Sequence, residues 1–149
     1  MRKPATPPAN NLRLLVVDDN SRGLLARKVV LEEQGYQVTT CCTPEEALAL
    51  FETSPFDIVV TDYRMPNING VELLERLRSI RPVPVVLMSG MVEVLGLNEG
   101  NTGADAVVTK NSHEIVNMLR AVNRLATKPP KKSPGPQGSG PKRKKASGE

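Results

Sequence analysis

Residues 56–74 read FDIVVTDYRMPNINGVELL and combine a mostly apolar run, a polar loop and the start of a helix. The run over 56–61 is short, which is typical of a strand buried on both faces of a sheet. The run stops at Asp62, and a loop with Pro66 and Gly70 leads to a segment with helical spacing. The apolar residues of that segment are Leu73, Leu74, Leu77 and Ile80. This stretch therefore predicts a strand followed by a helix.

The same order of strand and helix recurs along the chain. The expected strands cover residues 12–17, 36–40, 56–61, 83–88 and 106–109. The intervening and closing segments, among them 20–34, 91–100 and 112–126, are expected to be helical. Strands that alternate with helices predict a parallel sheet covered by helices on both faces. The expected fold class is therefore α/β, with a five-stranded doubly wound parallel sheet.

Three of these helices carry specific expectations. The first is expected to bury one apolar stripe, formed by Leu25, Ala26, Val29 and Val30. Its charged residues should then face solvent, namely Arg27, Lys28, Glu32 and Glu33. The segment 91–100 should be the weakest helix, because Gly96 and Gly100 each disfavour a helix by about 1 kcal/mol relative to Ala. Ser112 is expected to cap the last helix.

The charge of the chain divides it into three parts. Residues 11–126 hold 11 basic and 15 acidic residues, a net charge of −4, and are expected to form one domain. Residues 127–149 hold seven basic residues and one acid, with five prolines and four glycines. This composition predicts a disordered basic tail, and 1–10 predicts a disordered lead-in. Within the tail, 128–145 is a candidate contact for polyanions, without sequence preference because it has no aromatic residue.

The chain shows no pattern of secretion or membrane insertion. Its first residues lack the apolar stretch of a signal peptide, and no apolar run approaches the length of a membrane span. The two cysteines, Cys41 and Cys42, are adjacent and rarely bridge each other in such a position. A protein with reduced thiols in the cytoplasm is the expected class.

Polar residues follow four of the expected strands. They are Asp18 and Asp19 after the first, Asp62 after the third, Ser89 after the fourth and Lys110 after the fifth. The carboxyl ends of parallel strands share one edge of the sheet, where ligands of such folds bind. Three carboxylates at one edge repel one another and favour a bound cation. Mg²⁺ fits this oxygen-rich set, which contains no His or Cys for zinc or copper.

A carboxylate beside Mg²⁺, an ammonium group and a hydroxyl is suited to phosphoryl transfer. One aspartate can act as the nucleophile and form an aspartyl phosphate. The metal and Lys110 would stabilise charge on the phosphoryl oxygens, and Ser89 would donate a hydrogen bond to the attached group. These residues therefore predict phosphoryl transfer at the edge of the sheet.

Four separated motifs resemble those of the response-regulator receiver family. They are VVDDN at 16–20, TDYRMPNINGVELL at 61–74, VVLMSG at 85–90 and VVTK at 107–110. The resemblance covers residues 11–126 and implies a (βα)5 flavodoxin-like fold of two-component signalling. It also implies that the domain receives a phosphoryl group from a histidine kinase or phosphotransfer protein. Such a domain would catalyse only its own phosphotransfer and dephosphorylation, and it would not be an enzyme in any other sense. Output would come from a protein partner, from dimerisation after phosphorylation, or from passing the group onward.

The resemblance also implies a role for each motif residue. Asp62 would be the phosphoacceptor and Asp19 a direct Mg²⁺ ligand. Asp18 would hold the metal partly through water, and the backbone carbonyl of Arg64 would complete the protein ligands. Ser89 would be the switch hydroxyl, and Lys110 the charge partner of Asp62.

The chain departs from the family pattern at two positions. Val107 stands where the family often has an aromatic residue, so an aromatic side chain cannot operate the switch. Lys110 is followed by Asn111 instead of proline, which favours a trans peptide bond there. Both departures leave open a second reading, a pseudo-receiver that binds partners without phosphorylation.

Two enzyme classes fit the sequence less well. A phosphatase with an aspartate nucleophile would have a second aspartate two residues later, where this chain has Arg64. A dinucleotide-binding enzyme would have a glycine-rich turn after the first strand, whereas Gly23 stands alone and Asp18 and Asp19 would repel phosphates.

Overall fold

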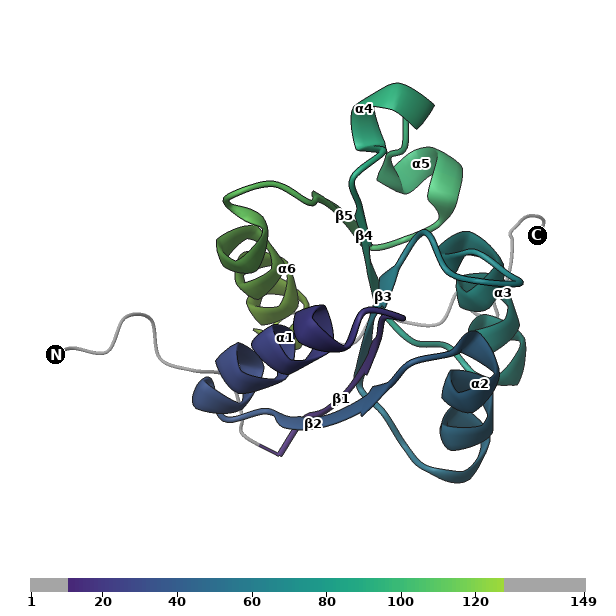
Figure 1. The fold of residues 1–149 in the computed structure, drawn as a ribbon. Coiled ribbons are helices and arrows are strands. Elements are labelled where there is room, and N and C mark those ends of the chain that lie inside the picture. Colours follow the sequence, from purple (N-terminus) through teal and green to yellow (C-terminus); the bar gives the residue numbers. More distant parts are fainter. Residues whose placement is uncertain (1–10, 128–149) are drawn as a thin grey trace, which may run out of the picture.

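The computed structural model describes residues 11–127 of the chain. Five strands form one parallel sheet in the order β2-β1-β3-β4-β5 (Figure 1). The strands are β1 (Arg13–Val17), β2 (Gln37–Cys41), β3 (Ile58–Asp62), β4 (Val85–Ser89) and β5 (Ala106–Thr109). β3 lies at the centre of the sheet, and all of its residues are buried. The predicted five-stranded doubly wound parallel sheet is confirmed.

Helices cover both faces of the sheet. They are α1 (Ser21–Glu33), α2 (Pro44–Thr53), α3 (Gly70–Ile80), α4 (Val92–Leu95), α5 (Glu99–Thr102) and α6 (Glu114–Thr127). α1 and α6 lie on one face, while α2 and α3 lie on the other (Figure 1). Each face has its own apolar core, one including Leu31 of α1 and Met118 of α6, the other Phe51 of α2 and Leu77 of α3. The aliphatic strands are therefore buried from both sides, as the apolar runs predict.

The buried face of α1 differs from the predicted one. Leu24, Arg27 and Leu31 are buried, whereas Leu25 is 63% exposed and Val29 is 47% exposed. The prediction that Leu25, Ala26, Val29 and Val30 form the buried stripe was wrong, because it assumed that the basic Arg27 must face solvent. Arg27 takes an inward position three residues from Leu24 and four from Leu31. Its burial depends on acidic partners outside the helix.

Local side chains determine where the helices begin. Asn20 accepts from the backbone N–H groups of Arg22 and Gly23 at the start of α1. Thr43 caps α2 as predicted, accepting from the N–H of Glu46 at 3.1 Å. The predicted cap of α6 by Ser112 was wrong, because the Asn111 side chain accepts the N–H of His113 instead, at 2.8 Å. An amide oxygen can bond a nearby backbone N–H in such a turn as readily as a hydroxyl does.

The connection between β4 and β5 contains two short helices instead of one. α4 ends at Gly96, which has a φ of 65°, and α5 ends at Gly103, which has a φ of 82°. Both residues are in the left-handed conformation that favours glycine and stops a helix. α4 buries none of its residues, and Val94 is 76% exposed. Where one weak helix was predicted over 91–100, two single turns lie beyond the carboxyl end of β4 (Figure 1).

We expect residues 91–100 to exchange amide hydrogens faster than α6. Each helix there has four residues, and so short a helix is marginal without tertiary packing. α6 is longer and buries Met118, Ala121 and Val122 against the sheet. Hydrogen–deuterium exchange of the full chain, read by mass spectrometry, measures both segments at once. Protection of 91–100 equal to that of α6 would contradict this expectation.

Several sequence predictions concern residues outside the described part. The lead-in 1–10 and the tail from 128 onward, with its polyanion contact, lie there, while Thr127 is the last residue of α6. Within residues 11–127 every peptide bond is trans, including the one between Lys110 and Asn111. No helix of the same segment has the length and apolar character that a membrane crossing requires.

Candidate functional site

The topology brings the polar strand ends to one edge of the sheet. β1 pairs with β3 so that Val17 lies opposite Thr61, which places Asp18 level with Asp62. β4 pairs with β5 so that Ser89 lies opposite Thr109, and the N–H of Lys110 donates to the carbonyl of Ser89 at 2.9 Å. The chain leaves β1 and β3 toward opposite faces, so a crevice opens between their ends.

A cleft of about 540 Å³ lies at this edge. Its walls include Asp18, Asp19, Asp62, Arg64, Ser89 and Lys110. The structure thus brings together every residue that the sequence places in the site. The loop after β3 and the turn after β4 complete the walls, with Met65, Pro66, Gly90 and Met91.

Three carboxylates crowd one end of the cleft. Asp18, Asp19 and Asp62 each offer an oxygen, and these oxygens lie within 4.8 Å of one another. Asp18 and Asp62 are buried, whereas Asp19 is exposed. Like charges at this distance in a partly buried site repel one another, and a hard cation relieves the repulsion. The oxygen-only donor set fits Mg²⁺, with Asp18, Asp19 and Asp62 as the side chains that would hold it.

Lys110 is the direct charge partner of Asp62. Its Nζ lies 2.6 Å from Oδ1 and 2.7 Å from Oδ2 of Asp62, and its hydrogen bond is directed at Oδ2. Oδ1 is buried and accepts no hydrogen bond from the described residues. Oδ1 is nevertheless in ionic contact with the Lys110 ammonium, so the negative charge of Asp62 is partly balanced within the site.

Burial raises the pKa of Asp62 to about 6, because the carboxylate loses its hydration. The hydrogen bond from Lys110 opposes this shift, while the negative charge of Asp18 adds to it. The pKa remains below 7, so the carboxylate form of Asp62 predominates at neutral pH.

A family comparison agrees with this geometry. Residues 14–123 match the model of the response regulator receiver domain. The chain belongs to this family. The match covers the whole sheet except the first residue of β1, together with the cleft and most of α6.

Solved receiver domains share the fold over nearly their whole length. The receiver domain of the Francisella response regulator 1452 is 33% identical, with a TM-score of 0.70 over 78% of this chain and 97% of that one. A CheY-like receiver domain protein from Methanospirillum hungatei is 30% identical, with a TM-score of 0.68 over 77% and 94%. TrrA from Thermotoga maritima, solved in complex with Mg²⁺-BeF, is 29% identical with a TM-score of 0.68 over 76% and 98%.

The curated relatives are longer proteins. The transcriptional regulatory protein CpxR of Klebsiella pneumoniae is 34% identical over 118 residues, which are 75% of this chain and 49% of CpxR. The probable transcriptional regulator ycf27 of Cyanidium caldarium is 35% identical over 100 residues, 65% of this chain and 39% of that protein. This chain thus spans half or less of these relatives, and it matches them in the receiver domain of two-component regulators.

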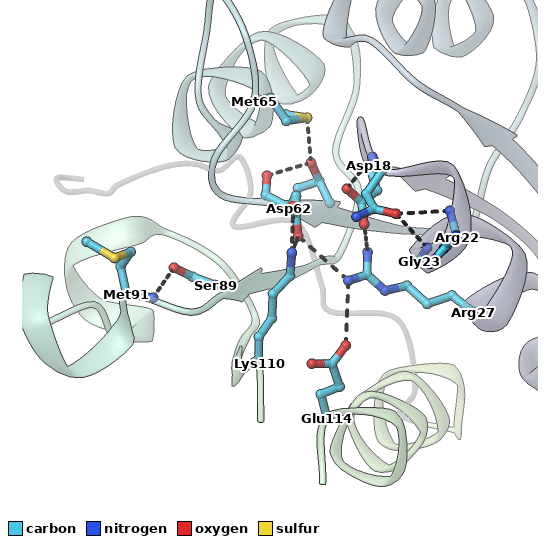
Figure 2. A network of polar contacts seen from close by, with 12 residues as sticks. Asp18, Arg22, Gly23, Arg27, Asp62, Met65, Ser89, Met91, Lys110 and Glu114 are labelled. Atoms are coloured by element: carbon cyan, nitrogen blue, oxygen red, sulfur yellow. Dashed lines mark hydrogen bonds and ion pairs between the residues drawn. The ribbon is translucent and has the colours of Figure 1, made fainter. Parts of the chain in front are cut away.

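Ser89 lines the cleft of this receiver domain on the other side of Asp62 from Asp18 (Figure 2). Its Oγ accepts the N–H of Met91 at 2.8 Å, which joins the end of β4 to the residue before α4 (Figure 2). A hydroxyl that accepts one bond still has its own proton to donate. Ser89 therefore keeps a hydroxyl proton to donate at the wall of the cleft, and its role as the switch hydroxyl stays a prediction.

Two charged residues near the receiver site were missed by sequence reasoning. Arg27 of α1 lies 2.9 Å from Asp18 and 3.7 Å from Asp62, measured between charged atoms (Figure 2). Glu114 of α6 lies 4.0 Å from the same guanidinium. The spacing of residues in α1 could have predicted the burial of Arg27. Arg27 lies three residues after Leu24 and four before Leu31, on the same face of the helix, and one turn after Gly23. Amphipathic patterning assigns an arginine to solvent and so hides this arrangement.

We expect Mg²⁺ to stabilise the receiver domain, because it neutralises part of the repulsion among the three carboxylates. The gain in unfolding free energy is about 2.7 kcal/mol when Mg²⁺ is present at 100 times its dissociation constant. Asp19→Asn should abolish most of this gain at little cost to the fold, since Asp19 is exposed. Thermal melts with EDTA and with MgCl₂ measure the effect. Glu75→Gln, at an exposed site on α3, is the matched control and should keep the wild-type shift.

Proposed function

We propose that this receiver domain accepts a phosphoryl group on Asp62 from a histidine kinase or phosphotransfer protein, in a Mg²⁺-dependent reaction, and signals through a protein partner. The observation that carries the proposal is the carboxylate of Asp62. It is buried, both of its oxygens contact the Lys110 ammonium, and it stands beside Asp18 and Asp19. Such a carboxylate combines a nucleophile with a means of stabilising charge.

The transfer forms one bond and breaks another. An oxygen of Asp62 attacks the phosphorus of the donor, and the bond from phosphorus to the donor's imidazole nitrogen breaks. The nitrogen keeps the electron pair of that bond, and the aspartyl phosphate remains on the receiver. Bound Mg²⁺ would supply positive charge to the phosphoryl oxygens. Water later attacks the phosphorus, the bond between phosphorus and the Asp62 oxygen breaks, and inorganic phosphate leaves the restored carboxylate.

Two side chains and one backbone carbonyl have defined roles in this proposal. Lys110 neutralises charge on the transferring group, because its ammonium already contacts both oxygens of Asp62. Ser89 donates its hydroxyl proton to the attached phosphoryl group, and this movement would loosen its bond to the N–H of Met91. The carbonyl of Arg64 is proposed as the backbone ligand of the metal, since Arg64 lines the cleft. The complex of TrrA with Mg²⁺-BeF supports a site of this chemistry in a similar receiver.

The proposal is tested by phosphorylating the purified chain with acetyl phosphate. Intact-mass spectrometry should show the addition of one phosphoryl group when Mg²⁺ is present and none in EDTA. Fragmentation of the product should place the group on Asp62. Modification of a different residue, or no modification with Mg²⁺ bound, would refute the assignment.

A pseudo-receiver is the second candidate function. It is favoured by Val107 and Asn111, which depart from the family pattern, and by the buried ion pair of Arg27 with Asp18. The guanidinium of Arg27 thus supplies positive charge to the acidic cluster without a metal. A domain of this kind would bind its partner with the same affinity before and after treatment with acetyl phosphate and would remain unmodified.

A further inference from the structure

The guanidinium of Arg27 lies behind the acidic cluster and inside the protein. Arg27 is 2% exposed and does not line the cleft. Its Nη1 lies 2.9 Å from Oδ2 of Asp18, and its Nη2 lies 3.7 Å from Oδ1 of Asp62. The charge therefore acts on both carboxylates through the wall of the cleft, from the side of α1 (Figure 2).

The sequence of α1 leaves room for this arrangement. Gly23 stands one turn before Arg27, and a Cβ atom at Gly23 would lie 2.8 Å from Oδ2 of Asp18 and 4.0 Å from Nη2 of Arg27. The other oxygen of Asp18 accepts the N–H of Asn20 at 2.9 Å. Asp18 is thus held between the start of α1 and the guanidinium, in space that a larger residue at position 23 would fill.

Arg27 contacts its acidic neighbours mainly through charge, and its guanidinium makes few directed hydrogen bonds. A buried guanidinium usually donates several directed hydrogen bonds to offset its loss of hydration. Here Nε and Nη1 donate no well-directed bond to any described residue, although Nη1 is in ionic contact with Asp18. Glu114 adds a third acidic group 4.0 Å away, from α6. Arg27 thus contributes a positive charge shared among three carboxylates.

We propose that Arg27 is an internal counter-cation that sets the Mg²⁺ affinity of this receiver. With no metal bound, its charge offsets the repulsion between Asp18 and Asp62 and keeps the acidic edge folded. With metal bound, Arg27 and Mg²⁺ share the same carboxylates and repel each other, which weakens metal binding. This inference rests on the metal site of the proposed function and adds an affinity-determining residue to it.

The test compares three variants of the full chain. Arg27→Met removes the charge but keeps an unbranched apolar side chain, whereas Arg27→Lys keeps the charge without the planar fork. Lys28→Met is the matched control, because it changes the net charge equally on the neighbouring residue, whose ion pair with Glu32 has side chains 38% and 42% exposed. Calorimetric titration with MgCl₂ gives the dissociation constant, and thermal melts in EDTA and in saturating MgCl₂ give the stability.

Arg27→Met should bind Mg²⁺ roughly tenfold more tightly than the wild type, since a unit charge a few ångströms from the carboxylates is removed. Its melting temperature should fall in EDTA and recover largely in MgCl₂. Arg27→Lys and Lys28→Met should keep nearly wild-type Mg²⁺ affinity. An Arg27→Met variant that folds only when Mg²⁺ is added would also support the proposal, because the metal then replaces the lost charge.

Other outcomes would overturn the proposal. Equal dissociation constants for the wild type and Arg27→Met would show that the charge of Arg27 does not reach the metal. Unfolding of Arg27→Met in both EDTA and MgCl₂ would show that Arg27 acts through packing alone. An equal change in the Mg²⁺ dissociation constant of Lys28→Met would show that the effect comes from the net charge of the protein and not from the position of Arg27. Absence of Mg²⁺ binding in every variant, the wild type included, would instead refute the metal site of the proposed function.

Discussion

Asp62→Asn is expected to abolish acceptance of a phosphoryl group and to stabilise the fold in Mg²⁺-free buffer at pH 8. The amide oxygen is a poor nucleophile, and Asp62 is the acidic residue in the cleft that contacts Lys110 directly. After treatment with acetyl phosphate and Mg²⁺, the intact mass of the variant should be unchanged. Asp57→Asn is the control, because Asp57 is exposed at the opposite end of β3, and it should be modified like the wild type.

The stabilising effect of the same substitution follows from the pKa of Asp62. Burial raises that pKa from 3.8 to about 6 in the folded protein. The folded state therefore binds a proton more tightly than the unfolded state, and wild-type stability falls as the pH rises from about 4 to about 6. The amide that replaces the carboxyl group carries no charge, so the variant should escape this loss, which is about 3 kcal/mol above pH 7 at 1.36 kcal/mol per pKa unit.

Urea unfolding at pH 4 and pH 8, in EDTA, measures this difference. The variant should be clearly more stable than the wild type at pH 8 and nearly equal to it at pH 4. A variant less stable than the wild type at pH 8 would show that the ion pairs of Asp62 with Lys110 and Arg27 outweigh its burial.

Gly70→Ala is expected to destabilise the domain by about 3 kcal/mol, at the upper end of the usual cost of overpacking. A Cβ atom at Gly70 would lie 2.4 Å from the carbonyl oxygen of Asp62, 2.6 Å from Cδ1 of Leu87 and 3.0 Å from Cα of Tyr63. Two of these atoms belong to the backbone that carries Asp62, so no side-chain rotation relieves the contact. Helix propensity alone would stabilise the Ala variant by about 1 kcal/mol. A loss of unfolding free energy in Gly70→Ala would therefore come from the packing around position 70.

Chemical denaturation of the purified variants measures the effect. Gly90→Ala is the matched control for stability, because a Cβ atom there meets no atom within 4 Å. Its unfolding free energy should stay close to that of the wild type. Equal stability of Gly70→Ala and Gly90→Ala would mean that α3 can move away from β3 at little cost.

Much of this receiver domain could be predicted from local patterns in the chain. Every strand except β2 (Gln37–Cys41) is a short, mostly aliphatic run with a polar residue at its end or just after it, and the period of the following segment changes to that of a helix. In a parallel sheet all such ends lie at one edge, so Asp18, Asp62 and Lys110 could be brought together before any coordinates were known. Strand order and residue chemistry therefore predict which polar side chains share the site. The assignment of Asp62 as the phosphoacceptor rests instead on the resemblance of its motif to the receiver family, and it stays a prediction.

Other features depend on contacts between distant segments. Arg27 is buried because Asp18, Asp62 and Glu114 from three other elements surround it, and no pattern within α1 contains that information. The raised pKa of Asp62 likewise comes from the burial of its carboxylate in the assembled structure. The choice between one helix and two after β4 depended on whether Gly96 would adopt a left-handed conformation. Burial and electrostatics are properties of the assembled structure, and only the tertiary fold decided them.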